Sequence, residues 1–411
     1  MLSETAKKIY APVNYELQEK RQALLEENFE KAFGKAPQML FSAPGRSEIC
    51  GNHTDHNMGK AVGAAIDLDI LAAVTPTDNG IIHICSEGFP EIEVNCNACE
   101  YKKEEEGTSL ALVKGIVSYL KANGRKVGGF NACSVSDVGR GSGLSSSAAY
   151  EVLIVGILNE LYNNNQMSPM EIALCAHSAE NKFFGKACGT LDQLSCAYGG
   201  MIAIDFENPL KPVCSPIEFS FEKTGYSMVI TDVHSDHADL TADYVAIKNE
   251  MQAVANHFGK DYLRQVDFED FKDSLPALKA KVSERALLRA FHYFNENNRV
   301  DALYSTLNKN NFDDFLDIVN DSGRSSYMYL QNIYSQNAPE NQAMSLALYL
   351  AQNILLGRGA WRVHGGGFGG TMQAYVPNDY VEAYCEEMDS VFGQNSSIVL
   401  QIRPVGPVRI K

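Results

Sequence analysis

The chain has 411 residues, of which 45% are hydrophobic and 21% are charged. This length suits two domains, and the composition is that of a soluble globular protein with a sizeable core. With 51 acidic and 35 basic residues, the formal net charge is −16. Such a surface repels phosphate backbones, so we expect no nucleic-acid partner. Any anionic ligand must therefore bind at a local site that favours negative charge, such as a set of oriented backbone N–H groups.

The cysteines and the apolar segments indicate a location. Ten cysteines are present, and several lie in apolar runs such as ALCAHSAE, where a free cysteine behaves as a small hydrophobe. The first 22 residues contain no uninterrupted apolar segment of the kind that directs secretion. Asp67 and Asp69 interrupt the most apolar stretch, AVGAAIDLDILAAV, so no membrane span is expected. We expect a monomer in the reducing cytoplasm.

Helices and strands alternate in the first part of the chain. Residues 14–33 have the spacing of an amphipathic helix that ends at Gly34. Strands are predicted over 38–46 and 61–77, and a hairpin runs from 80–88 into 91–96. A helix over about 108–123 and a strand over 128–138 follow.

Two helices come next, and the chain then changes from alternating strands and helices to longer helices. A strongly apolar helix follows the Gly/Ser segment 139–148. The second helix has its own start signal, with Ser168 as N-cap, Pro169 in the first turn and Glu171 three residues after the cap. It is expected to end at Gly185. Longer helices are expected between about 240 and 357, so we predict two domains, 1–205 and 206–411.

The segment GRGSGLSSSA (139–148) is the strongest functional signal. Its glycines permit unusual backbone angles, and its hydroxyl groups stand at the start of a helix. The first N–H groups of a helix lack internal partners and bind phosphate without any basic side chain. A flexible turn with a serine N-cap would give the same composition. The predicted strand before the segment and the long apolar helix after it favour an anion site.

A second glycine run, GGGFGG (365–370), fits the pattern G-x-G-x-x-G. A dinucleotide site needs a helix directly after these glycines. The residues that follow, TMQAYVP, alternate like a strand and end in proline. We therefore interpret the run as a place where the backbone approaches another part of the protein closely.

Two carboxylates have the right chemistry for phosphoryl transfer, which needs a metal ligand and a group that orients the attacking hydroxyl. Glu180 lies on the helix capped by Ser168, and Asp192 lies twelve residues later in the glycine-flanked segment CGTLDQLSCAYGG. A surface glutamate and an ordinary loop or cap aspartate are the alternative interpretations.

The stretch GNHTDHN (51–57) could be a metal site, a sugar site or a solvated loop. A dinuclear metallohydrolase is the rival hypothesis, because two His/Asp clusters are present, comprising His53, Asp55, His56, His234, His237 and Asp239. Their spacing does not identify a metal site. Cys96 and Cys99 form a single C-x-x-C with no second pair, so structural zinc is not expected there.

Four stretches together resemble the galactokinases of the superfamily that also includes homoserine, mevalonate and phosphomevalonate kinases. APGRSEICGNHTDHNMG (43–59) resembles the galactokinase signature G-R-x-N-L-I-G-E-H-T-D-Y-N, and GRGSGLSSSAA (139–149) resembles the phosphate loop. AENKFFGKACGTLDQ (179–193) is similar to the segment with the metal-binding glutamate and catalytic aspartate. HGGGFGGTMQAYV (364–376) is similar to the C-terminal glycine motif. Their order and spacing match across nearly the whole chain.

The resemblance implies roles in catalysis and ATP binding. Asp192 would be the base for the anomeric hydroxyl or the group that orients it. Arg46 would keep Asp192 ionised and hold the transferring phosphoryl group. Glu180 would hold Mg²⁺ together with Ser146 or Ser147. The ATP phosphates would lie on Gly141, Ser142, Gly143, Leu144, Ser145, Ser146 and Ser147.

It also implies a sugar site. Asp55 would accept hydrogen bonds from ring hydroxyls, while His53 and position 52 would lie near the 6-hydroxyl. Gly189 and Tyr244 also match positions that contact the sugar. Short, rigid, polar side chains suit a ligand made of hydroxyl groups.

Three residues depart from the family pattern. Asn52 replaces a glutamate, Glu48 replaces an asparagine, and His56 replaces a tyrosine. Asparagine donates as well as accepts hydrogen bonds and carries no charge. A buried mismatch costs about 1–3 kcal/mol, enough to change substrate preference. Galactose is the first expectation because Asp55 is retained, and galacturonate or another C6-modified hexose is the alternative.

The resemblance implies an α+β fold with an N-terminal domain like ribosomal protein S5 domain 2, a C-terminal ferredoxin-like domain and an active site in the cleft between them. The expected activity is ATP-dependent phosphorylation of galactose at the anomeric hydroxyl, with Mg²⁺ as cofactor. The alternatives are a related sugar 1-kinase, a non-catalytic sugar sensor and the metallohydrolase. The intact Arg46, Glu180 and Asp192 argue against a sensor.

Overall fold

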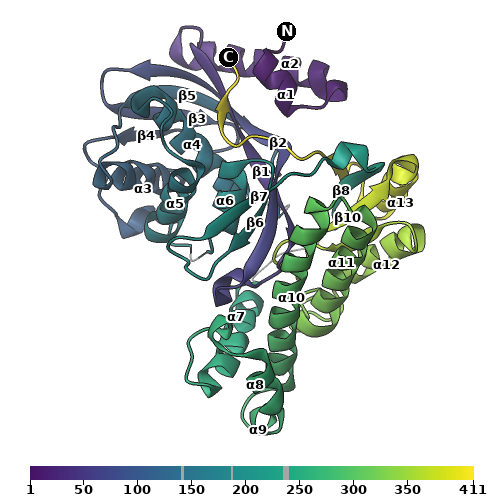
Figure 1. The fold of residues 1–411 in the computed structure, drawn as a ribbon. Coiled ribbons are helices and arrows are strands. Elements are labelled where there is room, and N and C mark those ends of the chain that lie inside the picture. The colour runs from purple at the N-terminus through teal and green to yellow at the C-terminus, as the bar shows by residue number, and fades with distance from the viewer. Residues whose placement is uncertain (140–142, 187, 235–239) are drawn as a thin grey trace.

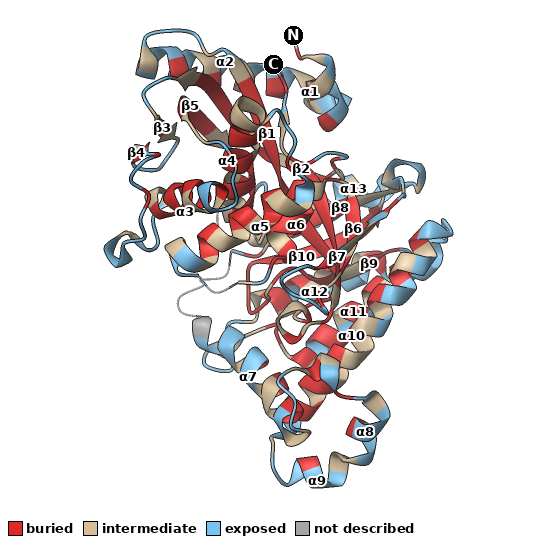
Figure 2. Ribbon diagram, turned by 60° about the vertical axis from the view of Figure 1, so that its left-hand side comes forward, coloured by how far each residue is buried: buried red, intermediate tan, exposed pale blue. Residues whose placement is uncertain are grey.

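The computed structural model describes residues 1–139, 143–186, 188–234 and 240–411. The chain forms a mixed α/β structure with one large and one small sheet, as expected from the sequence (Figure 1). Helices cover both sheets, and the strands between them are mostly buried (Figure 2). No helix among the described residues is both long and apolar enough to cross a bilayer.

The large sheet has the order β12-β1-β2-β5-β3-β4, with β6 paired to β2 and β7 paired to β6. Its neighbours are antiparallel except β3 and β5. The strands are β1 (Met39–Cys50), β2 (Lys60–Thr77), β3 (Ile81–Ser86), β4 (Ile92–Asn95), β5 (Gly129–Ser136), β6 (Met201–Asp205), β7 (Val213–Ile217) and β12 (Val408–Arg409).

Helices cover the two faces of this sheet unequally. One face packs on α1 (Glu4–Ile9) and α2 (Tyr15–Phe33) in a small apolar cluster. The other face forms the main core with α3 (Ser109–Ala122), α4 (Ser146–Asn163), α5 (Pro169–Ala179) and α6 (Leu191–Tyr198). Figure 1 shows α3 to α6 gathered on the side away from α1 and α2.

The small sheet is antiparallel and has the order β11-β8-β10-β9. Its strands are β8 (Tyr226–Asp232), β9 (Ala360–Val363), β10 (Thr371–Pro377) and β11 (Ser397–Leu400). One apolar cluster joins it to α12 (Ala343–Leu355) and α13 (Val381–Phe392). The remaining helices are α7 (Thr241–His257), α8 (Phe268–Asp273), α9 (Leu275–Lys279), α10 (Glu284–Asn308) and α11 (Phe312–Ser325).

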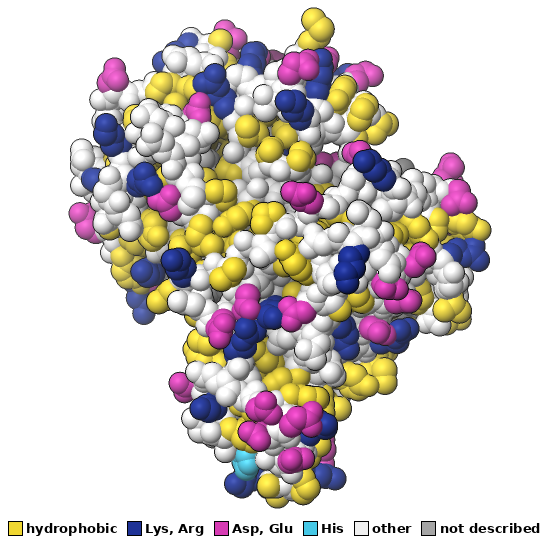
Figure 3. Space-filling view, in the orientation of Figure 1, with side chains coloured by type: hydrophobic (Ala, Val, Ile, Leu, Met, Phe, Trp, Pro, Cys, Tyr) yellow, Lys and Arg dark blue, Asp and Glu magenta, His cyan; other side chains and the backbone are white. Residues whose placement is uncertain are grey.

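Short helical turns complete the described elements. The 3₁₀ turns are Pro12–Asn14, Asp55–Asn57, Lys103–Glu105, Phe221–Lys223, Leu263–Gln265 and Asn378–Tyr380. Two π-helical turns extend longer helices, at Glu180–Phe184 after α5 and Ser326–Leu330 after α11. Helices α7 to α10 form the lower end of the molecule, where acidic side chains gather over α8 and α9 (Figure 3).

Several local predictions are confirmed. Helix α2 ends at Gly34, which has a left-handed φ of 69°. Ser168 and Glu171 form the predicted capping box of α5. The predicted hairpin forms as β3 and β4, and the segment after GGGFGG is the strand β10.

The large sheet continues past the predicted domain boundary at 205. That position ends β6, and the next strand, β7, pairs with β6 in the same sheet. The last strand, β12, also returns to this sheet and pairs with β1. We propose that the domains divide after Ile217, and that the chain end belongs to the first one.

A buried ionic network joins the chain ends to the large sheet. The Asp69 carboxylate on β2 is fully buried and accepts hydrogen bonds from Tyr10 and Ser42. Arg21 and Arg403 pair with the same carboxylate. Burial alone would raise the pKa of Asp69, but the two guanidinium groups outweigh it and hold that pKa below its ordinary value.

Asp69→Ala should lower the free energy of unfolding by about 3–5 kcal/mol, because it leaves Arg21 and Arg403 buried without their shared counter-charge. Chemical unfolding followed by circular dichroism measures the loss. Asp301→Ala is the matched control: this carboxylate is 60% exposed and pairs with Lys60, so its removal should cost less than about 1 kcal/mol. Equal losses in the two variants would contradict this account.

Candidate active site

The described part of the Gly/Ser segment, Gly143 to Ser147, runs into the start of α4. Gly143 has a φ of 69°, and the N-cap residue Ser145 has a φ of 61°. No side chain caps the first N–H groups of α4 from the N-cap position, so the helix start keeps its anion-binding character. Gly141 and Ser142, two predicted phosphate ligands, lie outside the described residues.

Leu144 contributes to this segment through its backbone. Its side chain is buried in the main core, and its carbonyl oxygen accepts a hydrogen bond from the Arg46 N–H at 3.1 Å. The segment is therefore fixed to β1, the strand that carries Arg46. Ser146 and Ser147 are the first two residues of α4, and both remain partly exposed.

Arg46 and Asp192 form an ion pair beside this helix start. The Arg46 Nε and Nη2 atoms lie 2.8 and 2.7 Å from Asp192 Oδ1. A further Arg46 nitrogen donates to the Gly143 carbonyl, and the Ser145 hydroxyl donates to Asp192 Oδ2. Arg46 is buried, whereas the Asp192 side chain is 32% exposed. The two predicted catalytic residues are thus brought together at the phosphate loop.

The pKa of Asp192 follows from this environment. Burial would raise the pKa of the carboxyl, but the Arg46 guanidinium and the Ser145 hydroxyl stabilise the anion more strongly. The pKa therefore lies below its ordinary value, and the group is a carboxylate at neutral pH. Such a group accepts hydrogen bonds from a hydroxyl and orients it.

Glu180 lies at the first position of a π-helical turn, a feature frequent at functional sites. Its carboxylate is 2% exposed and has four donors around it. Ser147 and Lys186 contact Oε1 at 3.1 and 2.8 Å, while Gln193 and Cys188 contact Oε2 at 2.7 and 3.0 Å. The predicted partnership of Glu180 with a loop serine is present for Ser147.

This oxygen-rich corner fits a hard cation. Carboxylate and hydroxyl oxygens are the ligands that Mg²⁺ prefers, and Mg²⁺ commonly takes only one or two carboxylates from the protein. The Lys186 ammonium group already lies against the Glu180 carboxylate, so the position attracts positive charge. Sequence reasoning missed Lys186, although it lies inside the segment that carries Glu180 and Asp192.

Asp55 and Gly189 meet in the neighbourhood of Asp192. A Cβ atom at Gly189 would lie 2.0 Å from Asp55 Oδ2, so only glycine allows this approach. Asp55 opens a 3₁₀ turn, and burial raises the pKa of its carboxyl. Two of the predicted sugar-site residues are therefore in direct contact.

His53 and Tyr244 form the next part of the same region. Their rings are stacked with centroids 6.2 Å apart. His53 Nε2 lies 2.8 Å from the Gly366 carbonyl oxygen, and the Tyr244 hydroxyl donates to the Gly367 carbonyl at 3.1 Å. Both side chains thus contact the second glycine run.

The glycine run is a close-approach segment, as predicted. A Cβ atom at Gly366 would lie 2.5 Å from Tyr244 Cε1. At Gly367, where φ is 79°, it would lie 2.1 Å from the Asn332 carbonyl oxygen. The run lies against Asn52 and His53 of the GNHTDHN turn and against Tyr244 and Asn332 of its own domain. No bulkier residue could replace Gly366 or Gly367.

Asn52 is placed among protein groups. It is fully buried, and its Nδ2 donates to Glu48 Oε1 at 2.9 Å and to the Gly365 carbonyl at 2.6 Å. Its Oδ1 accepts from Asn332 Nδ2 at 2.8 Å. Glu48 also pairs with Arg362 at 3.2 Å. The predicted contact of Asn52 with a 6-hydroxyl stays a prediction, since its amide is occupied within the protein.

Sequence reasoning did not identify the residues of α10 that hold this turn. Glu296 is fully buried, and its Oε1 accepts from the Gly51 N–H at 3.0 Å. His292 Nε2 lies 2.9 Å from the Asn52 carbonyl oxygen. Both residues lie in a helix more than 200 positions away in the chain, and no motif surrounds them. Only the fold brings them to the turn.

The rival metal site is not assembled by the described residues. Asn57 Nδ2 lies 2.9 Å from His56 Nδ1, and the His53 imidazole is engaged with Gly366. His237 and Asp239 lie outside the described residues. Within the described ranges, the side chains that converge as potential metal ligands are His83, Cys85 and Glu91. His53, Asp55 and His56 are not among them.

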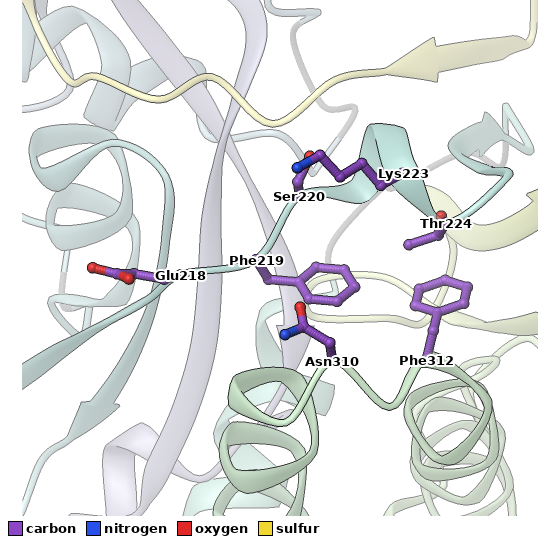
Figure 4. A pocket seen from close by; sticks show the side chains of 7 residues that line it. All are labelled: Glu218, Phe219, Ser220, Lys223, Thr224, Asn310 and Phe312. Carbon is purple, nitrogen blue, oxygen red and sulfur yellow. The ribbon is translucent and has the colours of Figure 1, made fainter.

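A separate hollow of about 590 Å³ lies where the chain passes from the first domain to the second (Figure 4). Phe219 and Phe312 stack in its wall with ring centroids 6.0 Å apart, and Lys223 and Thr224 lie near its rim. None of the predicted site residues lines it. The hollow therefore plays no part in the chemistry considered below.

An ion-paired aspartate at a helix-based phosphate loop, with a carboxylate and a hydroxyl beside it, defines a small-molecule kinase. Residues 27–76 match the galactokinase galactose-binding signature, and residues 111–200 match the GHMP kinases N-terminal domain. A galactokinase from Glaesserella parasuis is 32% identical over 88% of this chain and 91% of its own. The chain belongs to the galactokinase family.

Two further proteins extend the comparison. A galactokinase from Clostridium acetobutylicum is 28% identical over 90% of this chain and 93% of its own. The crystal structure of Lactococcus lactis galactokinase complexed with galactose is 25% identical, has a TM-score of 0.80 and covers 95% of this chain and 99% of that one. The likeness extends through both domains.

His56, which departs from the family's tyrosine, has a measurable consequence. Burial lowers its pKa to about 3, and His53 and Lys248 add to this effect. Its Nε2 is buried with no hydrogen-bond partner among the described residues. As pH falls below the ordinary histidine pKa of 6.5, His56 takes up a proton in the unfolded chain but stays neutral in the folded protein. The stability contributed by neutral His56 is therefore complete above 6.5 and lost toward 3.

Between pH 7.5 and 5.0, His56 should account for about 2 kcal/mol of the fall in the free energy of unfolding. His56→Gln should reduce that fall by the same amount, as measured by chemical unfolding at both pH values. His257→Gln, in the last turn of α7, serves as the control and should keep the wild-type pH dependence. An unchanged dependence in His56→Gln would show that His56 is protonated in the folded protein.

Proposed function

We propose that this protein transfers the γ-phosphoryl group of ATP to the anomeric hydroxyl of galactose, giving galactose 1-phosphate and ADP. The observation that carries the proposal is the position of the Arg46–Asp192 pair. The pair contacts the helix start that suits phosphates through Gly143 and Ser145. Asp192 also lies three residues after Gly189, which contacts Asp55 in the proposed sugar site. Family membership supports the same reaction.

Each group has a defined task in this proposal. The N–H groups of residues 143–147 hold the phosphates of ATP through the positive end of the α4 dipole. Asp192 accepts a hydrogen bond from the anomeric hydroxyl and orients it for in-line attack, while Arg46 stabilises the charge that develops on the transferring group. Asp55 accepts hydrogen bonds from the ring hydroxyls.

Glu180 and Ser147 would hold Mg²⁺ with the ATP phosphates, and Ser146 is the other candidate ligand at the helix start. When bound, the ion neutralises charge on the β- and γ-phosphate oxygens. Gln193 holds Glu180 Oε2 at 2.7 Å and so fixes the orientation of that carboxylate. Lys186 must share or give up Glu180 Oε1 when the cation enters.

The exchange at positions 48 and 52 supports galactose over a uronic acid. The family pattern has asparagine at 48 and glutamate at 52, whereas this chain has glutamate at 48 and asparagine at 52. The two side chains are hydrogen-bonded at 2.9 Å, so this corner still holds one carboxyl group and one amide. In this proposal the sugar's C6 faces this corner, where the Arg362 guanidinium is already paired with Glu48, so a second carboxylate at C6 would have no counter-charge of its own. The departure is thus a local rearrangement of the same chemical groups.

The test is consumption of Mg-ATP with galactose and galacturonate side by side, with the product identified by NMR. We expect galactose 1-phosphate and at least about 100-fold higher kcat/KM for galactose, since one unfavourable buried charge contact is worth about 3 kcal/mol. Turnover of galacturonate alone would support the proposed phosphoryl transfer but show that the substrate is a uronic acid and not galactose. Failure with both sugars would reject the proposal and return attention to a binding-only protein.

Asp192→Asn should lower kcat by about 10²–10⁴-fold while leaving ATP affinity within a few-fold, because the amide cannot provide the anion that orients the hydroxyl. ADP release gives kcat, and calorimetry gives the ATP dissociation constant. Asp301→Asn, at an exposed surface pair, is the control and should retain full turnover. Turnover near wild type in Asp192→Asn would remove this residue from the mechanism.

The remaining expectations concern where and how the protein acts. A monomer in the cytoplasm fits a kinase of free sugars, and the net charge of −16 disfavours binding to nucleic acid. Lys and Arg side chains are interspersed with Asp and Glu on the face drawn in Figure 3. The reduced state of all ten cysteines is consistent with that location. Gel filtration with light scattering gives the oligomeric state directly.

A further inference from the structure

The face of the large sheet that carries α2 has a group of metal-ligating side chains far from the active site. His83 and Cys85 are two residues apart on β3 and therefore point to the same face. Ile82 and Ile84, which alternate with them, are buried in the main core on the other face. Cys85 lies with Cys133 and Phe33 in the apolar cluster under α2.

The neighbouring strands place two more ligands beside them. Cys85 and Cys133 are direct partners in the parallel pairing of β3 and β5, and their thiols interact through a hydrogen bond. On the other side, His83 pairs with Glu93 across the hairpin, which places Glu91 opposite Cys85. Glu91 contacts the His83 imidazole Nε2. Ligand atoms of His83, Cys85 and Glu91 all lie within 4.8 Å of one another.

The surroundings favour a cation at this position. Phe33, the last residue of α2, packs edge-on against the His83 ring at 5.1 Å, so the negative end of the helix dipole lies nearby. Glu93 lies 3.5 Å from His83 Nδ1, where it can orient the ring while Nε2 binds a metal. Cys133 is buried and Glu91 is exposed, so one side of the group is open to solvent and the other is closed.

The chemistry of the ligands selects the metal. Thiolate and imidazole together prefer zinc over magnesium or calcium, and structural zinc takes four ligands in tetrahedral geometry. A simple His–Glu pair on a surface would need neither thiol. We propose that His83, Cys85 and Glu91 form a zinc-binding site on the α2 face of the large sheet, and that Cys133, which lies beside Cys85 but outside this group, completes it when the metal binds.

The proposal has a chemical consequence for binding. Burial raises the pKa of the Cys133 thiol to about 12, and burial together with Glu91 raises that of Cys85. Cysteine binds zinc as the thiolate, so zinc binding at these thiols releases protons. Zinc affinity should increase with pH.

The test uses the full chain, reduced, stripped with a chelator and dialysed against micromolar zinc chloride. Mass spectrometry of the bound metal should give one zinc per chain at this site. Cys85→Ser and His83→Gln should bind zinc at this site at least about tenfold more weakly. Cys385→Ser, at a half-buried cysteine on α13, is the matched control and should bind as the wild type does. Sugar phosphorylation should be unchanged in all three variants, which also shows that they fold.

Cobalt(II) provides a readout that needs no variant. Binding at two thiolates should give a sulfur-to-cobalt charge-transfer band in the near ultraviolet, and zinc should abolish it. Wild-type protein that binds no zinc, or variants that bind it equally well, would overturn the proposal. A Cys85–Cys133 disulfide that persists in the reduced protein would overturn it as well, since it would consume both thiols.

Discussion

The ion pair between Arg46 and Asp192 is the interaction on which the site depends. It joins β1 to α6, and its hydrogen bonds to Gly143 and Ser145 fix the phosphate segment against both. The same pair keeps the aspartate ionised despite burial, because the guanidinium outweighs the loss of water. Loss of either partner would therefore change the charge of the site and the path of the loop together.

The second domain completes the site through glycines rather than through charged groups. Gly366 and Gly367 bring its backbone against Tyr244 and Asn332 at distances that no side chain would permit. Asn52 bonds directly to this run and to Glu48. The junction is thus rich in buried hydrogen bonds, although Asn332 Oδ1 has no partner among the described residues. An unmatched buried group of this kind costs about 1–3 kcal/mol. The exchange of residue types at 48 and 52 keeps one carboxyl group and one amide, hydrogen-bonded to each other at 2.9 Å.

Local signals in the sequence predicted most of the elements, and the structure brings the proposed catalytic residues Arg46 and Asp192 together. The capping box at Ser168, the glycine after α2 and the alternation after GGGFGG are short-range features, and each formed as predicted. Groups brought in by long-range packing, such as Glu296 and His292, carried no such signal. The sheet likewise extended past residue 205 because β7 pairs with β6, a choice that alternation alone does not encode.

The return of the chain to its first sheet affects how the protein must be made. Asp69 and Arg403 are 334 positions apart, and β1 pairs with β12 at the far end of the chain. During translation, Asp69 has only Arg21 as its cationic partner, and a stretch of β1 stays uncovered, until Arg403 and β12 have left the ribosome. A fragment that stops after Ile217 would lack both partners, so it should resist independent folding and regain structure when the rest of the chain is supplied separately.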